Sequence, residues 1–344
     1  FFSGMMMPIM QFVGNLGYVM VALLGGVFVI KGSIEVGDIQ SFFQYIRNFT
    51  QPIQQIAQVT NLLQSSAAAS ERVFEFLEEE EEVQQPEHPD SIEGLNGNVQ
   101  FEHVEFGYNP DKIIVHDFSA DVHDGQKIAI VGPTGAGKTT MVKLLMRFYD
   151  VNKGAIKVDG HDVRNFNRSE LHEMFGMVLQ DTWLFSGTIM ENIRYGRLDA
   201  TDEEVIAAAK AAHIHSFIMQ QPGGYQMVLD EETSNISQGQ KQLLTIARAI
   251  LADNKILILD EATSSVDTRT EMQIQKAMDN LMKGRTSFVI AHRLSTIKDA
   301  DLILVMKDGD IIEQGDHEEL LAAKGFYADL YNSQFDNGSS ELCS

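Results

Sequence analysis

Residues 132–139 combine glycines, a lysine and a hydroxyl side chain at a spacing that suits phosphate binding. Their sequence, Gly-Pro-Thr-Gly-Ala-Gly-Lys-Thr, fits the pattern G-x-x-x-x-G-K-[ST], in which backbone N–H groups curl around phosphate oxygens. We expect Lys138 to reach the β- and γ-phosphates of a nucleotide and the Thr139 hydroxyl to bind Mg²⁺. The residues predicted to contact the nucleotide are Gly132, Pro133, Thr134, Gly135, Ala136, Gly137, Lys138, Thr139 and Thr140.

A second apolar run, 256–261, ends in two carboxylates, Asp260 and Glu261. Mg²⁺ prefers oxygen ligands, so Asp260 at the tip of a strand suits a role in binding the metal. Glu261 suits the general base that activates a water for attack on the γ-phosphate. The alternative is an acidic strand end without chemistry, and the phosphate-binding pattern elsewhere in the chain argues against it.

A third apolar run, 286–291, is closed by His292. An isolated histidine is usually structural, but this one follows a strand in the same way that Asp260 does. Open α/β sheets bind their ligands at the carboxyl ends of the strands. We therefore expect Lys138, Asp260, Glu261 and His292 to meet at one edge of a sheet.

The elements that position these residues begin at Val99, where short apolar strands start to alternate with helices. This alternation predicts an α/β domain with a largely parallel sheet. Within it, a strand at 127–131 and a helix at 140–148 should flank the glycine-rich loop, so that the positive end of the helix faces the phosphates. Residues 78–98 contain prolines, glycines and an acidic run, and we interpret them as a solvated linker rather than a docking tail.

The first 30 residues contain no charged side chain. A helix from Met5 to Ile30 would be about 39 Å long, more than the ~30 Å hydrocarbon core of a membrane. A buried helix of a soluble domain is the alternative, which the length and the absence of charge disfavour. Because the chain opens with Phe1 in apolar sequence, we expect it to be cut from a longer polypeptide, and we find no signal peptide.

A second helix is expected from about Ile39 to Leu77, with its polar residues on one stripe. Such a stripe either lines a translocation pathway or forms a helix–helix seam held by amide hydrogen bonds, and the sequence leaves both open. Pro52 is a candidate kink, and Arg47 is a charge that must find a partner or water. The stripe consists of Gln40, Gln44, Arg47, Gln51, Gln54, Gln58, Asn61 and Ser65.

The composition excludes some partners. The formal net charge is −23, which argues against a nucleic-acid partner because phosphates are neutralised by clustered Lys and Arg. The only cysteine, Cys343, cannot form an internal disulfide, which fits a reducing, cytosolic location.

Residues 235–249, Asn-Ile-Ser-Gln-Gly-Gln-Lys-Gln-Leu-Leu-Thr-Ile-Ala-Arg-Ala, resemble the signature motif of ABC proteins and its helix. Residues 99–335 resemble an ABC nucleotide-binding domain, an α/β P-loop ATPase with a RecA-like core and a helical subdomain at about 162–252. Residues 1–77 resemble the last two transmembrane helices of an ABC exporter half-transporter of the bacterial heterodimeric multidrug type. Residues 336–344 would be a tail. The remaining helices of such a half-transporter would precede this chain.

The resemblance implies further roles around ATP and Mg²⁺. Tyr108 would stack on adenine, with a strand-end core aromatic as the alternative. Gln180 would sense Mg²⁺ and couple the ATPase to the membrane helices, and His292 would be the switch histidine. Glu231 and Glu232 would lie near the intracellular helices. Trp183 and Phe185 would only pack, and Ser264, Ser265 and Asp267 would form the loop after Glu261.

In this family two domains close head to tail, so that Ser237, Gly239 and Gln240 would contact the ATP held by a partner's P-loop. The usual signature is Leu-Ser-Gly-Gly-Gln, whereas Gln238 here replaces a glycine. The lost glycine would restrict the approach to phosphate. We therefore favour a heterodimer with a second, different half-transporter, and a homodimer is the alternative.

Taken with the resemblance, these patterns predict an ATP-hydrolysing exporter subunit of the cell membrane, with a multi-pass membrane part and a cytoplasmic nucleotide-binding domain. The cargo would be a drug-like or amphipathic small molecule, and membrane lipid would surround the helices. A lipid or peptide exporter or flippase with the same engine is the alternative. An importer subunit and a soluble ABC ATPase acting on DNA or ribosomes are disfavoured by the attached apolar helices, and the latter also by the acidic charge.

Overall fold

The computed structural model describes residues 2–79, 86–109, 111–179, 182–230, 235–260, 267–290 and 294–333. The chain divides into two compact units, Phe1–Gln84 and Gln85–Ser344. Each unit is described by itself below.

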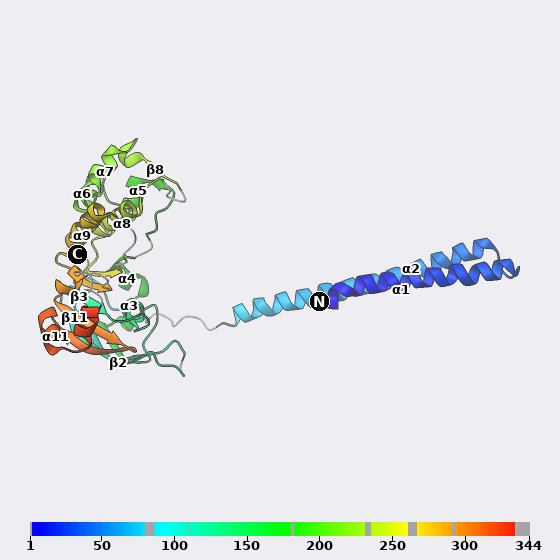
Figure 1. Cartoon of the computed structure of the whole chain (residues 1–344), viewed down its shortest axis with the longest axis horizontal. Helices are drawn as coiled ribbons and strands as arrows, with labels where there is room; N and C mark the ends of the chain where they lie inside the picture. The colour runs from blue at the N-terminus through cyan, green and yellow to red at the C-terminus, as the bar shows by residue number, and fades with distance from the viewer. Residues whose placement is uncertain are drawn as a thin grey trace, which may run out of the picture. The chain divides into compact units, whose positions relative to one another are not determined.

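The first unit is a helical hairpin in which α1 (Phe2–Ile30) and α2 (Val36–Leu77) run side by side (Figure 1). Small residues let the two helices approach closely. A Cβ added to Gly25 would lie 2.8 Å from Ile39, and one added to Gly14 would lie 3.6 Å from Thr50. The close approach accounts for the glycine at position 25, whereas a Cβ on Gly26 would meet nothing within 4 Å.

The second helix starts three residues before the predicted Ile39 because Glu35 caps it. The Glu35 backbone N–H donates to the Asp38 carboxylate at 2.9 Å, which satisfies a free end of the helix. Pro52 lies inside α2 and does not end it. Among the described helices, one stretch, Gln11–Ile30 of α1, is long and apolar enough to cross a membrane. The polar stripe lowers the mean hydropathy of α2, so α2 is not apolar enough to meet this criterion.

The second unit is built on a six-stranded sheet in the order β12-β11-β3-β10-β9-β6. The pairs from β11 to β6 are parallel, and β12 is antiparallel to β11. This arrangement confirms the predicted α/β fold class. The strands are β3 (Lys127–Val131), β6 (Phe175–Val178), β9 (Ile256–Asp260), β10 (Thr286–Ile290), β11 (Leu302–Lys307) and β12 (Asp310–Gly315).

A separate antiparallel sheet, in the order β2-β1-β4-β5, covers part of the central sheet. Alternate residues of a strand point to opposite faces, and the core follows this rule. Ile128 and Ile130 of β3 pack toward the antiparallel sheet, whereas Ala129 and Val131 pack on the opposite face. The additional strands are β1 (Val99–Phe106), β2 (Val115–Val122), β4 (Lys153–Val158) and β5 (His161–Asp162).

The helix after the glycine-rich loop, α3, spans Lys138–Leu145, so it ends earlier than the predicted Phe148. Arg147 takes a positive φ of 55°, which breaks the helix. Its guanidinium is buried, pairs with Asp150 at 3.0 Å and donates to the carbonyl oxygens of Val163 and Phe166. The turn therefore serves to place a buried cation against the core.

A helical part lies at one end of this unit (Figure 1). The predicted range of 162–252 for it is too wide, because α4 (Arg168–Glu173) packs Leu171 into the core and β6 joins the central sheet. The helical part follows β6 and packs on α9 (Thr268–Met282). Its elements are β7 (Gly187–Thr188), α5 (Ile189–Arg194), α6 (Asp202–Ala211), α7 (His215–Gln220), β8 (Val228–Leu229) and α8 (Gln238–Ala252). Three further helices, α10 (Leu294–Lys298), α11 (His317–Ala323) and α12 (Phe326–Tyr331), complete the unit.

Candidate nucleotide site

The glycine-rich loop connects the carboxyl end of β3 to the first turn of α3. Gly137, at φ 99°, is the N-cap of α3 and offers no side chain to the free N–H groups of the first turn. Those N–H groups and the positive end of the helix dipole remain available to an anion. The local backbone is therefore arranged for phosphate.

Two glycines hold this loop against the β11–β12 hairpin. A Cβ on Gly132 would lie 2.2 Å from the Met306 carbonyl oxygen, so only glycine fits there. From the hairpin turn, the Gly309 N–H donates to the Ala136 carbonyl at 3.2 Å. The sequence reasoning missed Gly309. The Asp308-Gly309 pair is a turn signal that could have located the hairpin, but not its bond to the loop.

The Lys138 ammonium lies within the loop and donates to the carbonyl oxygens of Gly132 at 2.6 Å and Pro133 at 3.1 Å. Burial lowers the pKa of Lys138, and the negative charge of Asp260 partly offsets this effect. Backbone oxygens thus bind this partly buried ammonium, and a carboxylate lies near it. Phosphate oxygens would add further compensating negative charge.

The loop and the end of β9 share a pocket of about 440 Å³. Asp260 lines it together with Thr139, so the structure brings the two predicted Mg²⁺ ligands to one cavity. Ile114 and Ile290 also line it, and the sequence reasoning named neither. Ile114 lies in the connection before β2, where nothing in its sequence context points to a nucleotide. The other lining residues are Thr134, Gly135, Ala136, Gly137, Lys138 and Thr140.

The three predicted strand ends are neighbours, because β10 lies between β3 and β9. In register, Ile290 is opposite both Ile130 and Asp260, so the chain leaves all three strands at one edge. The residues predicted to follow these ends, Glu261 and His292, lie outside the described residues. Gln180, Glu231, Glu232, Ser264 and Ser265 lie outside them as well.

Tyr108 lies beside α3. Its hydroxyl is 3.4 Å from the Thr140 hydroxyl, and its ring packs edge-to-face on Phe106 and Tyr149. The residue is 43% exposed, which does not fit a buried core aromatic. The ring is therefore free to present a surface near the loop.

The predicted signature residues form the N-terminus of α8, away from the glycine-rich loop. Ser237 caps the helix: its N–H donates to the Gln240 side chain at 2.8 Å and its hydroxyl accepts from the Gln240 N–H. Gly239 is buried in this turn. None of Ser237, Gly239 and Gln240 lines the pocket that contains Lys138. Within one chain, the two halves of the expected site thus stay apart.

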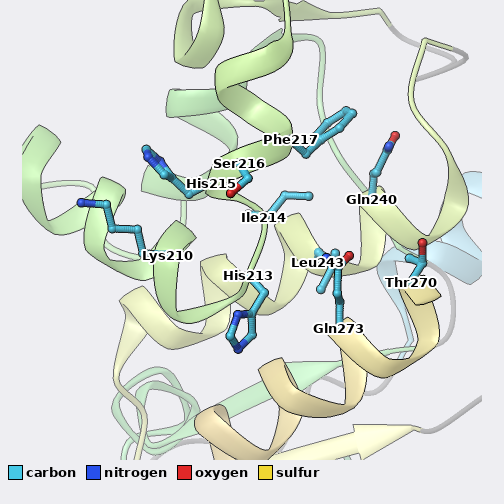
Figure 2. Close-up of a pocket in the computed structure, with 10 residues that line it drawn as sticks. All are labelled: Lys210, His213, Ile214, His215, Ser216, Phe217, Gln240, Leu243, Thr270 and Gln273. Atoms are coloured by element: carbon cyan, nitrogen blue, oxygen red, sulfur yellow. The ribbon is translucent and has the colours of Figure 1, made fainter.

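Gln240 instead lines a polar pocket of about 300 Å³ between α8, α9 and the α6–α7 connection (Figure 2). The rings of His213 and His215 point in different directions there (Figure 2), and His215 bonds the Tyr225 hydroxyl at 2.8 Å. Across the described ranges, no group of three or more His, Cys, Asp or Glu side chains could hold a metal ion. We therefore do not interpret this pocket as a metal centre.

Three other residues singled out in the sequence lie close to these elements. Asp267 caps α9 by accepting from the Thr270 N–H at 3.0 Å. Hydrogen bonds from the Thr270 side chain, and then from its backbone N–H, lower the pKa of the carboxyl. Trp183 contacts Phe185 and Tyr195 through its ring and is 62% exposed.

A glycine-rich loop between a parallel strand and a helix, with an aspartate at the end of β9, the next strand but one in the sheet, defines the chain's second unit as a P-loop ATPase domain. Residues 115–264 match the family model for the ABC transporter. A fatty acid ABC transporter ATP-binding/permease protein of Mycobacterium bovis is 54% identical over 95% of this chain and 52% of its own length. The chain is thus similar to ABC transporter ATP-binding/permease proteins, and it spans about half the length of the relatives it matches.

Two further comparisons also match nearly the whole chain. An ATP-dependent lipid A-core flippase of Desulfotalea psychrophila is 43% identical over 95% of this chain and 57% of its own length. The solved structure of a bacterial Atm1-family ABC exporter with ATP bound matches with a TM-score of 0.70 and 37% identity, over 94% of this chain and 58% of that one. The fold is accordingly that of an Atm1-type exporter.

Proposed function

We propose that this chain is the ATP-binding and ATP-hydrolysing part of an ABC exporter subunit that couples hydrolysis to export of an amphipathic or drug-like substrate. The observation that carries the proposal is the pocket shared by Lys138, Thr139 and Asp260, on the same chain as a helix apolar enough to cross a membrane. The ATPase domain would lie in the cytoplasm of a multi-pass membrane protein. Lipid or peptide export by the same engine is the second candidate.

The pocket supplies hard oxygen donors, a carboxylate and a hydroxyl, which suit Mg²⁺ bound together with nucleotide phosphates. We assign Thr139 and Asp260 to the metal, with Gln180 as a further ligand. Bound Mg²⁺ would neutralise charge that develops on the phosphates. Lys138 would hold the β- and γ-phosphates, and residues 132–140 would surround them.

The remaining roles follow the family resemblance. Glu261 would accept a proton from the attacking water, and His292 would face the γ-phosphate. Tyr108, which lies beside α3, would stack on the adenine through its exposed ring.

The separation of the signature residues from the P-loop pocket supports a dimer in which each ATP contacts two chains. Ser237, Gly239 and Gln240 would complete the site of a partner half-transporter. We favour a heterodimer because Gln238 replaces the usual glycine. Its side chain donates a hydrogen bond to Thr182 of its own domain at 3.2 Å. A side chain held in this way need not block the phosphate of a partner's ATP, so a homodimer stays the alternative. Co-purification of a tagged full-length subunit with only itself, at full ATPase activity, would refute the heterodimer.

The test of the function is transport by the full-length protein, with its partner, in proteoliposomes. We expect ATP-dependent movement of an amphipathic substrate, and loss of both hydrolysis and movement in Lys138→Met. The matched control is Lys143→Met, on the same helix but outside the pocket lining. Hydrolysis that persists in Lys138→Met, or hydrolysis with no movement of lipid, peptide or drug probes, would contradict the proposal.

A further inference from the structure

Three aromatic rings meet just after the end of β1, beside α3. Phe106 is buried in the core, whereas Tyr108 and Tyr149 are each 43% exposed. The centroid of the Tyr108 ring lies 5.0 Å from that of Phe106 and 5.0 Å from that of Tyr149, and both pairs are edge-to-face. Tyr149 also contacts Phe106, with 5.7 Å between the centroids. Two neighbouring rings therefore limit the orientations that are open to the Tyr108 ring.

The segment that carries Tyr149 is itself fixed to the core. Tyr149 lies between Arg147 and Asp150, whose side chains pair at 3.0 Å. The Arg147 guanidinium is buried and also donates to the carbonyl oxygens of Val163 and Phe166. Because it is costly to break the contacts of a buried cation, they keep the backbone around Tyr149 in place.

The same segment is also bonded to the turn that carries Tyr108. The side-chain oxygen of Asn152 accepts from the Gly107 N–H at 2.8 Å, across 45 residues of sequence. The Asn152 N–H donates to the Glu105 carbonyl oxygen at 2.9 Å. The rings of Tyr108 and Tyr149 thus stand on two backbone segments that are held against each other.

We propose that Tyr149 is a positioning residue for the nucleobase, because its ring fixes the orientation in which Tyr108 stacks on the adenine of ATP. This role rests on the stacking proposed for Tyr108 and acts through it. A side chain that is ordered before the ligand arrives loses less entropy on binding, so it strengthens binding without a new contact to the ligand. The Tyr108 hydroxyl, 3.4 Å from that of Thr140, restrains the same ring on the side of the phosphate loop.

A positioning role differs from a general structural one in what it changes. The reaction takes place at the γ-phosphate, so a contact to the base is the same in the ground state and in the transition state. Loss of such a contact raises the KM for ATP and leaves kcat unchanged. A triphosphate without a base does not use Tyr108, so its binding should not depend on Tyr149.

The test is steady-state ATP hydrolysis, with Mg²⁺, by the full-length subunit assembled with a partner whose own site is inactivated. Inorganic tripolyphosphate, which has no base, serves as the competing ligand and reports on phosphate binding alone. We expect Tyr149→Leu to raise the KM for ATP about 3- to 10-fold, the usual contribution of one aromatic pair. The kcat and the inhibition constant of tripolyphosphate should stay as in the wild type.

Two further variants separate the ring from its surroundings. Tyr149→Phe keeps the ring and should restore the wild-type KM. The matched control is Phe148→Leu, because Phe148 is the neighbouring exposed aromatic residue but packs on His172. Its KM for ATP should equal that of the wild type.

A double variant tests whether Tyr149 acts through Tyr108. In the Tyr108→Leu background, Tyr149→Leu should have no further effect on the KM for ATP. A further rise in that background, an unchanged KM in Tyr149→Leu alone, or an equal rise in the inhibition constant of tripolyphosphate would overturn the inference.

The two proposals fail separately. If Tyr108→Leu raises the KM for ATP and Tyr149→Leu does not, Tyr108 keeps its proposed role and the positioning role of Tyr149 is wrong. If Tyr108→Leu has the KM of the wild type, the proposed stacking on adenine is itself wrong.

Discussion

The Gln238 side-chain amide donates to the Thr182 hydroxyl at 3.2 Å. This bond joins the first residue of α8 to the segment that follows Gln180. From the sequence, the side chain of Gln238 was expected to restrict the approach of a partner's phosphate. In the structure it is held by its own domain, so its bulk is a weaker argument for a heterodimer than the substitution alone suggests.

The Gln238–Thr182 bond predicts a measurable coupling between these two positions. We expect Gln238→Leu, which retains good helix propensity, and Thr182→Val each to destabilise the domain. A double-mutant cycle should give about 0.5–1.5 kcal/mol of interaction, the usual net value of one hydrogen bond. Thermal unfolding of the unaltered chain, both single variants and the double variant measures it.

The control for that cycle is Gln275→Leu with Thr182→Val, because the Gln275 side chain donates to Asp279 within α9 and not to Thr182. These two changes should add without coupling. If the changes at Gln238 and Thr182 are equally additive, the bond contributes nothing measurable to the free energy of unfolding.

The placement of Lys138 predicts that its removal weakens ATP binding. Lys138→Met keeps the length of the side chain but leaves the phosphates without their cation. We expect ATP affinity to fall about 30- to 1000-fold, or about 2–4 kcal/mol. Isothermal titration with ATP and Mg²⁺ measures it, and Lys143→Met serves as the control on the same helix.

The same lysine predicts a pH dependence. Burial lowers the pKa of Lys138 in the free site, and phosphate oxygens would raise it again because they favour the charged form. Binding therefore takes up protons between the two pKa values, and ATP affinity should fall as pH rises through the lowered pKa of the free site. Titrations in buffers of different ionisation enthalpy detect the uptake. Proton uptake of the same size in Lys138→Met would assign it to another group.

The strands of the central sheet were predictable because they are buried on both faces. Lys127–Val131 and Ile256–Asp260 are continuous apolar runs, and such runs are typical of parallel strands covered by helices. The end of α3 was not predictable, since the break at Arg147 depends on carbonyl oxygens of Val163 and Phe166 that only the fold brings near. The antiparallel sheet was missed as well. Its β1–β4 pairing joins segments far apart in the chain, whereas its β1–β2 and β4–β5 pairings join consecutive strands.

Within the site, residues 132–139 could be proposed from the sequence because their residue types stand at consecutive positions. Ile114 and Gly309 came only from the structure. Ile114 reaches the pocket and Gly309 bonds the loop through tertiary contacts, and neither contact leaves a spacing in the sequence.

Glu261 is assigned as the general base on its position after β9. We expect Glu261→Gln to bind ATP with unchanged affinity and to lower turnover about 10²- to 10⁴-fold, the usual contribution of a general base. Single-turnover hydrolysis in the assembled transporter, with the partner's own site inactivated, isolates this step. Wild-type turnover in Glu261→Gln would show that another residue is the general base, and Glu271→Gln on α9 controls for the loss of a carboxylate elsewhere in the domain.

Gly309 ties the hairpin turn to the phosphate loop, which predicts that a single methyl group there disturbs both stability and nucleotide binding. A Cβ on Gly309 would lie 1.6 Å from the Ile114 carbonyl oxygen, and Gly309 also has a positive φ of 91°. The left-handed backbone costs alanine about 1–2 kcal/mol, and overpacking adds about 1–3 kcal/mol.

The matched control is Gly125→Ala, whose φ is 76° but whose surroundings are open, so it carries the backbone penalty alone. In urea unfolding, the free energy of unfolding of Gly309→Ala should be at least about 1 kcal/mol lower than that of Gly125→Ala. ATP binding should be weaker in Gly309→Ala only. Equal effects of the two substitutions would mean that the hairpin yields to the methyl group, and that Gly309 does not hold the loop.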